Sequence, residues 1–167
     1  MEQRARDLFI TGCKNAHAME RNAQEMLERQ IASLGERQYT ELKSRLREHL
    51  SETKQQLSRL DKILADLDTS PSMVKDTVET VSANMVAIAQ SMAGDAILKN
   101  SFASAALESY EIAAYNALLI LAEQAGIRVK TTLEDSLREE ERMLQWLNGN
   151  VEAVTLEFLK QEEKAAA

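Results

Sequence analysis

The sequence is poor in the residues that interrupt helices and in those that build disulfide-rich or strand-rich folds. Among its 167 residues there are one proline, five glycines and one cysteine, and aromatic residues make up only 4%. The single cysteine, Cys13, excludes an internal disulfide framework. Because it falls on the apolar stripe of the first predicted helix, we expect a small buried hydrophobe rather than a reactive thiol. This composition favours an all-α protein.

Long apolar runs and blocks of basic residues are missing as well. No apolar stretch approaches the roughly 20 residues that span a bilayer, and the opening residues, MEQRARDLFITG, lack the apolar segment of a secretory signal. The net charge is -7, and no cluster of Lys or Arg is long enough to follow a phosphate backbone. We therefore expect a cytoplasmic protein whose partners include neither nucleic acid nor a membrane.

Apolar residues recur at helical spacing along nearly the whole chain, without a convincing alternating strand pattern. Gly35 and Gly126 are expected to end the first and fourth helices, since glycine fills the left-handed position after a helix easily. The letters NGN at residues 148–150 are expected to end the fifth helix, before a short tail. The predicted helices cover about residues 3–34, 38–67, 71–92, 95–125 and 129–148.

Four long helices and one short helix predict a helical bundle. Tight turns after the first and fourth helices make two antiparallel hairpins, and the short helix lies in the longer connection between them. One long crossover that joins two hairpins is the ferritin-like arrangement of a four-helix bundle. We expect residues 1–160 to form a single domain and residues 161–167 to be a flexible C-terminal tail.

Every long helix places at least one carboxylate where an apolar side chain is expected. Glu20 lies in the seam of the first helix, and Glu140 takes the place of a leucine in the seam of the last. Glu108 and Glu111 flank the apolar line of the fourth helix, whereas Glu52 lies at the edge of the apolar face of the second. An unpaired buried charge costs several kcal/mol or neutralises itself, so this set requires an explanation.

Bound metal ions would explain the set. Cations with oxygen ligands satisfy buried carboxylates, and five carboxylates come close to the charge of two iron ions. Dinuclear bundle proteins take a Glu from each of two helices and a Glu-x-x-His from each of the other two. The alternative is that each carboxylate reaches solvent or pairs with Lys or Arg, and for Glu52 alone the two interpretations are evenly balanced.

Other polar residues lie close to the predicted site in the helical pattern. His49 and Gln56 share one line with Glu52 on the second helix. For His49 alone, a satisfied or exposed imidazole is favoured over a metal ligand, and His17 is expected near the surface. Tyr115 is first of all a core aromatic, although it can donate a hydrogen bond to a ligand carboxylate.

Four segments carry a resemblance to a known family. They are HAMERNA (17–23), HLSETKQQLSRL (49–60), FASAALESYEIAAYNALLILAEQAG (102–126) and LREEERMLQWL (137–147). The chain resembles the ferritin-like YciE/YciF family of bacterial stress-associated proteins over nearly its whole length. The resemblance implies a rubrerythrin-like four-helix core with an extra helix, a homodimer, and a dinuclear site for two divalent metal ions, with iron expected and manganese or another metal open.

Carried over by position, the resemblance implies metal ligands at Glu20, Glu52, Glu108, Glu111 and Glu140, with Glu140 chosen over Glu139 because it keeps the seam spacing. His49, Gln56 and Tyr115 are candidates for further ligands or for hydrogen-bond partners of the ligands. Two residues depart from the family pattern. Gln56 stands where many relatives have a histidine, and Met143 stands where a Glu-x-x-His would place another. An amide oxygen binds iron weakly and a thioether prefers softer metals, so the site is rich in carboxylates and poor in nitrogen.

Three functions fit these features. The first is a metal-dependent oxidoreductase that reduces oxygen or peroxide in stress defence. The second is a non-catalytic dimeric stress or interaction protein whose metal site is vestigial or structural. The third is iron storage, which would require a closed cage. The sequence alone names neither the metal nor a substrate.

Overall fold

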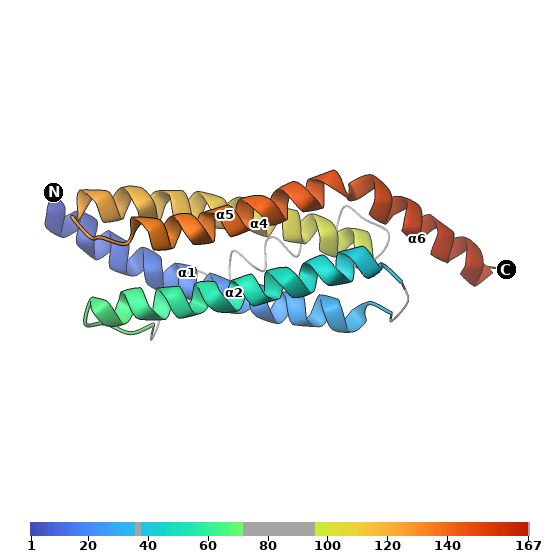
Figure 1. The fold of residues 1–167 in the computed structure, drawn as a ribbon, viewed down its shortest axis with the longest axis horizontal. Coiled ribbons are helices and arrows are strands. Elements are labelled where there is room, and N and C mark those ends of the chain that lie inside the picture. The colour runs from blue at the N-terminus through green and yellow to red at the C-terminus, as the bar shows by residue number, and fades with distance from the viewer. Residues whose placement is uncertain (36–37, 72–95, 167) are drawn as a thin grey trace.

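The computed structural model describes residues 1–35, 38–71 and 96–166, and within these ranges it consists of helices joined by turns (Figure 1). The prediction of an all-α helical bundle is confirmed. The short helix expected at about residues 71–92 falls almost wholly outside the described residues. The described helices are α1 (Glu2–Ser33), α2 (Thr40–Asp66), α4 (Ala96–Gln124), α5 (Lys130–Gly149) and α6 (Val151–Ala166).

Side-chain contacts give the directions of the bundle helices. Glu20 contacts Tyr115 and Gln30 contacts Ser104, so the order of contacts along α1 and α4 is opposite and the two helices are antiparallel. Figure 1 shows α1 and α2 as one antiparallel hairpin and α4 and α5 as another. Helix α2 ends at one end of the bundle and α4 begins at the other, which agrees with the expected long connection between two hairpins.

Two helices end at a residue with a left-handed backbone conformation. This conformation lets the following backbone N–H groups bond to the last carbonyl groups of the helix. Gly126, with φ of 65°, follows α4 as the sequence predicts. The N–H of Ile127 bonds to the carbonyl of Ala122 at 2.9 Å and that of Gly126 to Glu123 at 3.1 Å, the two bonds of a Schellman motif. Asp68, with φ of 55°, takes the same place after α2. Both ends stop their helices sharply and so fix the lengths of the two hairpins.

The turn between α1 and α2 differs from the prediction. Helix α1 ends at Ser33, and Leu34 is extended with φ of -80° and ψ of 128°. Among the described residues of this turn, the positive φ is found at Tyr39 (51°) and not at Gly35, so the left-handed role expected of that glycine is wrong. The ammonium group of Lys43 instead donates to the carbonyl oxygen of Leu34 at 3.0 Å and satisfies this end of the helix.

The chain after α5 also differs from the prediction, which placed a short tail there. Asn150 interrupts the helix, donating from its side chain to the carbonyl of Trp146 at 2.8 Å, and the helical path resumes at once as α6. Residues 161–166, assigned to a flexible tail, belong to this helix. Its Glu157 accepts the backbone N–H of Tyr39 at 2.7 Å, so α6 is anchored to the α1–α2 turn.

The buried apolar residues form two clusters rather than one continuous core. One contains residues of the first two thirds of α1 and extends from the middle of the bundle towards the end near Gly126. The other surrounds the α1–α2 turn and the end of α5. The larger cluster consists of Phe9, Cys13, Ala16, Met19, Ala23, Leu60, Ile63, Leu64, Leu107, Tyr115, Leu118, Ala122 and Leu133. The smaller one consists of Leu27, Leu34, Tyr39, Leu42, Leu46, Met143, Leu147 and Val154.

Cys13 confirms the expectation of a small buried hydrophobe. Its side chain is fully buried in the larger cluster, and burial raises the pKa of its thiol to about 12. Because the thiolate is the reactive form, this cysteine is inert at neutral pH.

Helix α4 is the most apolar of the bundle helices, yet it carries Glu108 and Glu111 on its buried side. None of the described helices combines the length and the apolar character needed to cross a membrane. Not all apolar side chains of α4 lie inside the bundle, since Phe102, Tyr110 and Ile120 are exposed.

Leu64→Ala should destabilise the protein by about 2–5 kcal/mol, because Leu64 is fully buried in the larger cluster and the substitution leaves a cavity. Ile120→Ala is the matched control, since Ile120 is 61% exposed and should change stability by less than about 0.5 kcal/mol. Urea unfolding monitored by circular dichroism measures both. Equal losses in the two variants would contradict the packing described here.

Candidate metal centre

A layer of polar side chains separates the two apolar clusters at the middle of the bundle. Each of the four bundle helices contributes at least one residue to it. All five predicted ligands are buried. The members of the layer and their exposed fractions are Glu20 1%, His49 1%, Glu52 8%, Gln56 0%, Glu108 2%, Glu111 1% and Glu140 0%.

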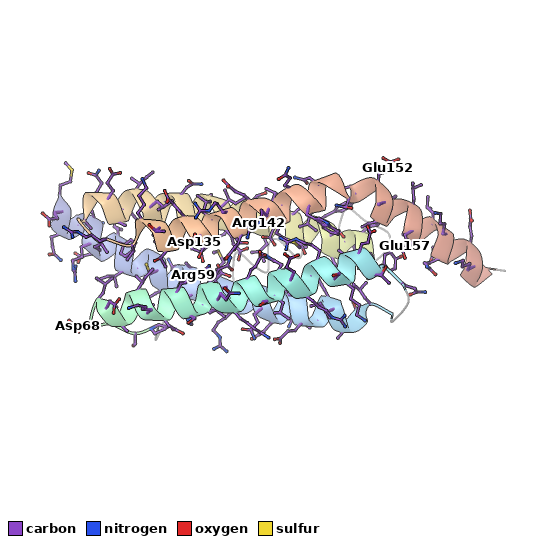
Figure 2. The ribbon with its side chains drawn as sticks, viewed as in Figure 1. Arg59, Asp68, Asp135, Arg142, Glu152 and Glu157 are labelled. Atoms are coloured by element: carbon purple, nitrogen blue, oxygen red, sulfur yellow. The ribbon has the colours of Figure 1, made fainter. Side chains whose placement is uncertain are left out.

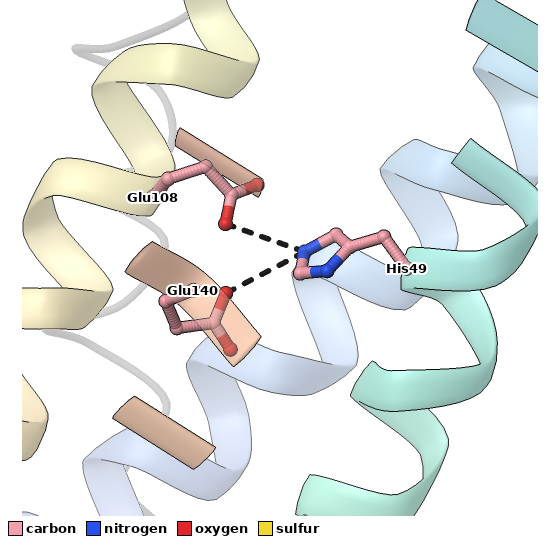
Figure 3. A group of neighbouring side chains, drawn as sticks. All are labelled: His49, Glu108 and Glu140. Carbon is pink, nitrogen blue, oxygen red and sulfur yellow. Dashed lines mark ion pairs between the residues drawn. The ribbon is translucent and has the colours of Figure 1, made fainter. Parts of the chain in front are cut away.

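His49 lies at the centre of this layer. Its Nε2 atom is 3.3 Å from Oε2 of Glu108 and 3.5 Å from Oε2 of Glu140 (Figure 3). One potential ligand atom from each of these three residues lies within 4.8 Å of the other two, as donors around one metal ion do. His49 is thus a satisfied imidazole, one of the two outcomes that the sequence favoured, and both of these partners, Glu108 and Glu140, are residues predicted to bind metal.

Glu52 is held by three cationic or potentially cationic donors. Nδ1 of His49 lies 3.1 Å from its Oε2, Nη1 of Arg45 lies 3.3 Å from the same oxygen, and Nη2 of Arg142 donates to Oε1 at 3.0 Å. Burial alone would raise the pKa of Glu52, but the hydrogen bonds from His49 and Arg142 and the charge of Arg45 outweigh it and lower the pKa to about 2. Glu52 is therefore ionised and already paired.

Glu20 is bonded to a tyrosine from the facing helix. The hydroxyl group of Tyr115 donates to Oε1 of Glu20 at 2.6 Å, so Tyr115 has the donor role that the sequence allowed for it. Burial raises the pKa of Glu20 to about 8, although the hydrogen bond from Tyr115 and the charge of His49 oppose the rise. The bond aims this carboxylate into the polar layer.

Gln56 is a hydrogen-bond donor to the last bundle helix. Its Nε2 donates to Oε1 of Glu140 and to Oε2 of Glu139, the latter at 3.0 Å. Glu139 is bound by both terminal nitrogens of Arg59, at 2.6 and 2.8 Å. The preference for Glu140 over Glu139 as the inward residue agrees with these contacts, because Glu139 is occupied by an arginine.

Two arginines, Arg59 and Arg142, lie over the seam between α2 and α5, and Figure 2 labels both. The sequence analysis did not identify them, nor Arg45, as parts of the site. A sequence signal exists for Arg45, which precedes Glu52 by seven residues and so lies on the same helical face. Pairing between α2 and α5 depends on the register of two helices far apart in sequence, which spacing alone does not give.

Oε1 of Glu111 has no hydrogen-bond partner among the described residues, and Oε2 of Glu108 and Oε2 of Glu140 have no well-formed hydrogen bond there, since their contacts with Nε2 of His49 are long, at 3.3 and 3.5 Å. Burial, followed by the charges of neighbouring glutamates, raises the pKa of both Glu111 and Glu140 well above its usual value. A buried oxygen without a donor is costly unless a cation or a proton satisfies it. These oxygens, together with the imidazole, fit a divalent cation that accepts oxygen ligands and one nitrogen, such as Fe(II) or Mn(II).

His17 and Met143 lie apart from these contacts. His17 pairs with Asp61 on the neighbouring helix at 3.1 Å, which agrees with a place near the surface. Met143 is fully buried in the smaller apolar cluster. Its thioether thus serves packing at the position where the family resemblance would place a second histidine.

Comparisons with known proteins agree with the predicted family. A family model described as a domain of unknown function, DUF892, matches residues 4–160. The solved structure of a protein from Xanthomonas campestris pv. campestris is 30% identical, with a TM-score of 0.76, and the match covers 95% of this chain and 99% of that one. These two findings cover nearly the whole chain.

Two further solved structures share the fold. YcfI from Rhodopseudomonas palustris, presented as a candidate structural protein, is 28% identical with a TM-score of 0.72, over 86% of this chain and 92% of its own. The Escherichia coli stress protein YciF is 21% identical with a TM-score of 0.74, over 90% of this chain and 96% of its own. The likeness to YciF supports the expected YciE/YciF-like architecture.

The metal-free protein should lose stability as the pH rises from about 5 to about 8. Glu20 ionises near 4.5 in the unfolded chain but only near 8 in the folded one, so the folded state holds more protons in this window. His49 acts in the same direction: burial lowers its pKa, but its bonds to Glu108 and Glu52 outweigh this and raise it to about 9. Its contribution is complete below pH 6.5 and disappears through pH 9.

Urea unfolding of chelator-treated protein at several pH values measures this slope, which is at most about 1.4 kcal/mol per pH unit for each such group. Glu20→Gln should flatten it, and Glu25→Gln should not, because Glu25 is an exposed glutamate on the same helix. Stability that increases over this range, or a slope unchanged by Glu20→Gln, would refute the prediction.

Proposed function

Because this chain belongs to the DUF892 family, a domain of unknown function, we propose that its function resides in the buried polar layer: it is a ferritin-like stress-associated protein that binds two divalent metal ions, with iron the expected metal. The observation that carries the proposal is the buried group of His49, Glu108 and Glu140, whose ligand atoms lie within 4.8 Å of one another, together with the unpartnered buried oxygen of Glu111. No other group of three or more His, Cys, Asp or Glu residues in the described ranges has ligand atoms so close together.

The residues of the layer divide into two groups under this proposal. His49, Glu108 and Glu140 would hold one ion, and Glu20 and Glu111 would hold the second, with Glu108 or Glu140 shared between them. Iron bound there would supply two electrons, enough with two protons to reduce a peroxide to two waters. The two apolar clusters on either side of the layer exclude bulk water from these groups.

Partners of the ligands would keep this arrangement in place. Tyr115 holds Glu20, and Gln56 holds Glu140. Arg59 binds Glu139 through both of its terminal nitrogens, so that carboxylate is already paired. Hydrogen-bonded partners of this kind orient ligands, and their loss typically lowers metal affinity about 10- to 100-fold.

The association with stress is proposed by analogy. YciF, whose fold this chain shares, is named a stress protein. A peroxide-consuming metal centre would suit such a role, since it removes an oxidant and oxidises ferrous iron in the same reaction. The analogy suggests that the protein acts during stress. It identifies no substrate, redox partner or cellular location.

The second candidate function is a non-catalytic dimeric protein whose metal site is structural. Gln56 and Met143 favour it, because they stand where the family resemblance places histidines, and nitrogen-poor sites bind iron less strongly. YcfI, presented as a candidate structural protein, is consistent with it. The two candidates differ in what bound metal does: it reacts in the first and only stabilises in the second.

Anaerobic protein loaded with Fe(II) should oxidise it rapidly after addition of peroxide, with one peroxide consumed for each two iron ions. The double variant Glu20→Gln/Glu140→Gln should be slower by more than about tenfold, since it loses groups assigned as ligands. Glu25→Gln is the control for removal of an exposed charge. Equal rates in all three proteins would rule out the redox function.

Thermal unfolding separates the two candidates further. Metal bound only to the folded state stabilises it by about 2.7 kcal/mol at a free concentration 100 times the dissociation constant. Stabilisation by metal without accelerated oxidation would favour the structural role. Melting that is insensitive both to added Fe(II) or Mn(II) and to chelators would contradict metal binding altogether.

A further inference from the structure

Building on the proposed metal site, we propose that His49 is its nitrogen ligand, through Nε2, and that Glu52 is a positioning residue that aims the ring of His49 rather than a ligand. This assignment differs from the family resemblance, which places a ligand at Glu52. The described contacts of the two residues distinguish the roles, because the acceptor oxygens of Glu52 are largely occupied by donors, whereas Nε2 of His49 faces the carboxylates of Glu108 and Glu140.

Glu52 has little capacity left for a metal ion. Its Oε2 is contacted by Nδ1 of His49 and by Nη1 of Arg45, and its Oε1 accepts from Arg142. Each carboxylate oxygen has two lone pairs that can accept hydrogen bonds. Both lone pairs of Oε2 are therefore occupied, and one lone pair of Oε1 remains. The single negative charge of Glu52 also faces two guanidinium groups, which are always charged, so a cation gains little by approaching it.

His49 has the opposite arrangement. With Nδ1 engaged by Glu52, its other nitrogen is aimed at Oε2 of Glu108 at 3.3 Å and Oε2 of Glu140 at 3.5 Å, and neither oxygen has a well-formed hydrogen bond in the described chain. A carboxylate that accepts the Nδ1–H bond of a histidine fixes the tautomer in which Nε2 can bind metal. His49 from α2, Glu108 from α4 and Glu140 from α5 then surround one ion from three helices.

The two arginines hold Glu52 from different sides. Arg45 is buried on α2, where it also pairs with the exposed Glu48 at 3.0 Å, whereas the side chain of Arg142 on α5 is 57% exposed. Arg142 thus connects α5 to α2 through Glu52, next to the proposed metal site. Its removal should loosen Glu52 without creating a cavity in the bundle, which makes it a useful probe.

Nitrogen-15 NMR of histidine-labelled protein tests the assignment with Zn(II), a diamagnetic probe metal. The chain has two histidines, so only two imidazoles contribute signals, and a His17→Gln variant assigns them. Saturating zinc should move Nε2 of His49 from its protonated to its metal-bound range while Nδ1 keeps its proton. The signals of His17, which pairs with Asp61, should stay in place.

Zinc titration of four variants then separates positioning from ligation. Glu52→Gln should keep the zinc stoichiometry of the unmodified protein and weaken binding by about 10- to 100-fold. Arg142→Gln should also weaken zinc binding, but by less than Glu52→Gln does. Glu48→Gln, which removes a charge one turn away, should have no effect. Glu108→Gln should lower the stoichiometry.

Each outcome decides between the two proposals. If zinc binds but the nitrogen signals of His49 do not move, His49 is not a ligand and the inference falls while the metal site stands. If Glu52→Gln, shown to be folded by circular dichroism, lowers the stoichiometry as Glu108→Gln does, Glu52 is a ligand and the inference is wrong. If neither Zn(II), Fe(II) nor Mn(II) binds the unmodified protein, the proposed function fails, and the inference with it.

Discussion

The desolvation of acidic side chains in the middle of the bundle is the constraint on which the rest of the structure depends. Glu20, Glu108, Glu111 and Glu140 are at most 2% exposed and lie between two apolar clusters, where ionised carboxylates are unstable without partners. A bundle of this size gains stability from continuous apolar contacts, and this chain gives up a full layer of them. Only groups that meet cations or protons can occupy that layer.

The distribution of arginines shows which acidic groups serve the fold and which remain available. Glu52 and Glu139, nearer the seam between α2 and α5, are bound by Arg142 with Arg45 and by Arg59 respectively. The deeper carboxylates contact no arginine in the described structure; their neighbours are a histidine, a tyrosine and an amide. Paired charges at the edge tie two helices together, whereas the inner oxygens keep the capacity to bind a cation.

Helical periodicity predicted the inner carboxylates because the repeat of 3.6 residues fixes which residues share a face. It could not predict the pairing between α2 and α5, since the register of helices distant in sequence arises from packing. For His49 the sequence favoured a satisfied or exposed imidazole, and its spacing of three residues from Glu52 was the available signal for the contact between these two side chains. The letters NGN at residues 148–150 predict the end of a helix, but an asparagine that bonds back to the preceding turn, as Asn150 does, interrupts a helix without preventing a new one from following.

Gln56 bears on what the proposed metal centre can do. Its Nε2 is committed to Glu139 and Glu140, so the nitrogen that the family resemblance expects there is supplied, under our inference, by His49, seven residues earlier on the same face of α2. One imidazole among carboxylates leaves an anionic set of ligands, and anionic oxygen ligands stabilise ferric iron more than ferrous iron. Oxidation of iron bound there would thereby be favoured and its re-reduction opposed. The donor set therefore suits consumption of an oxidant together with ferrous iron better than rapid redox cycling.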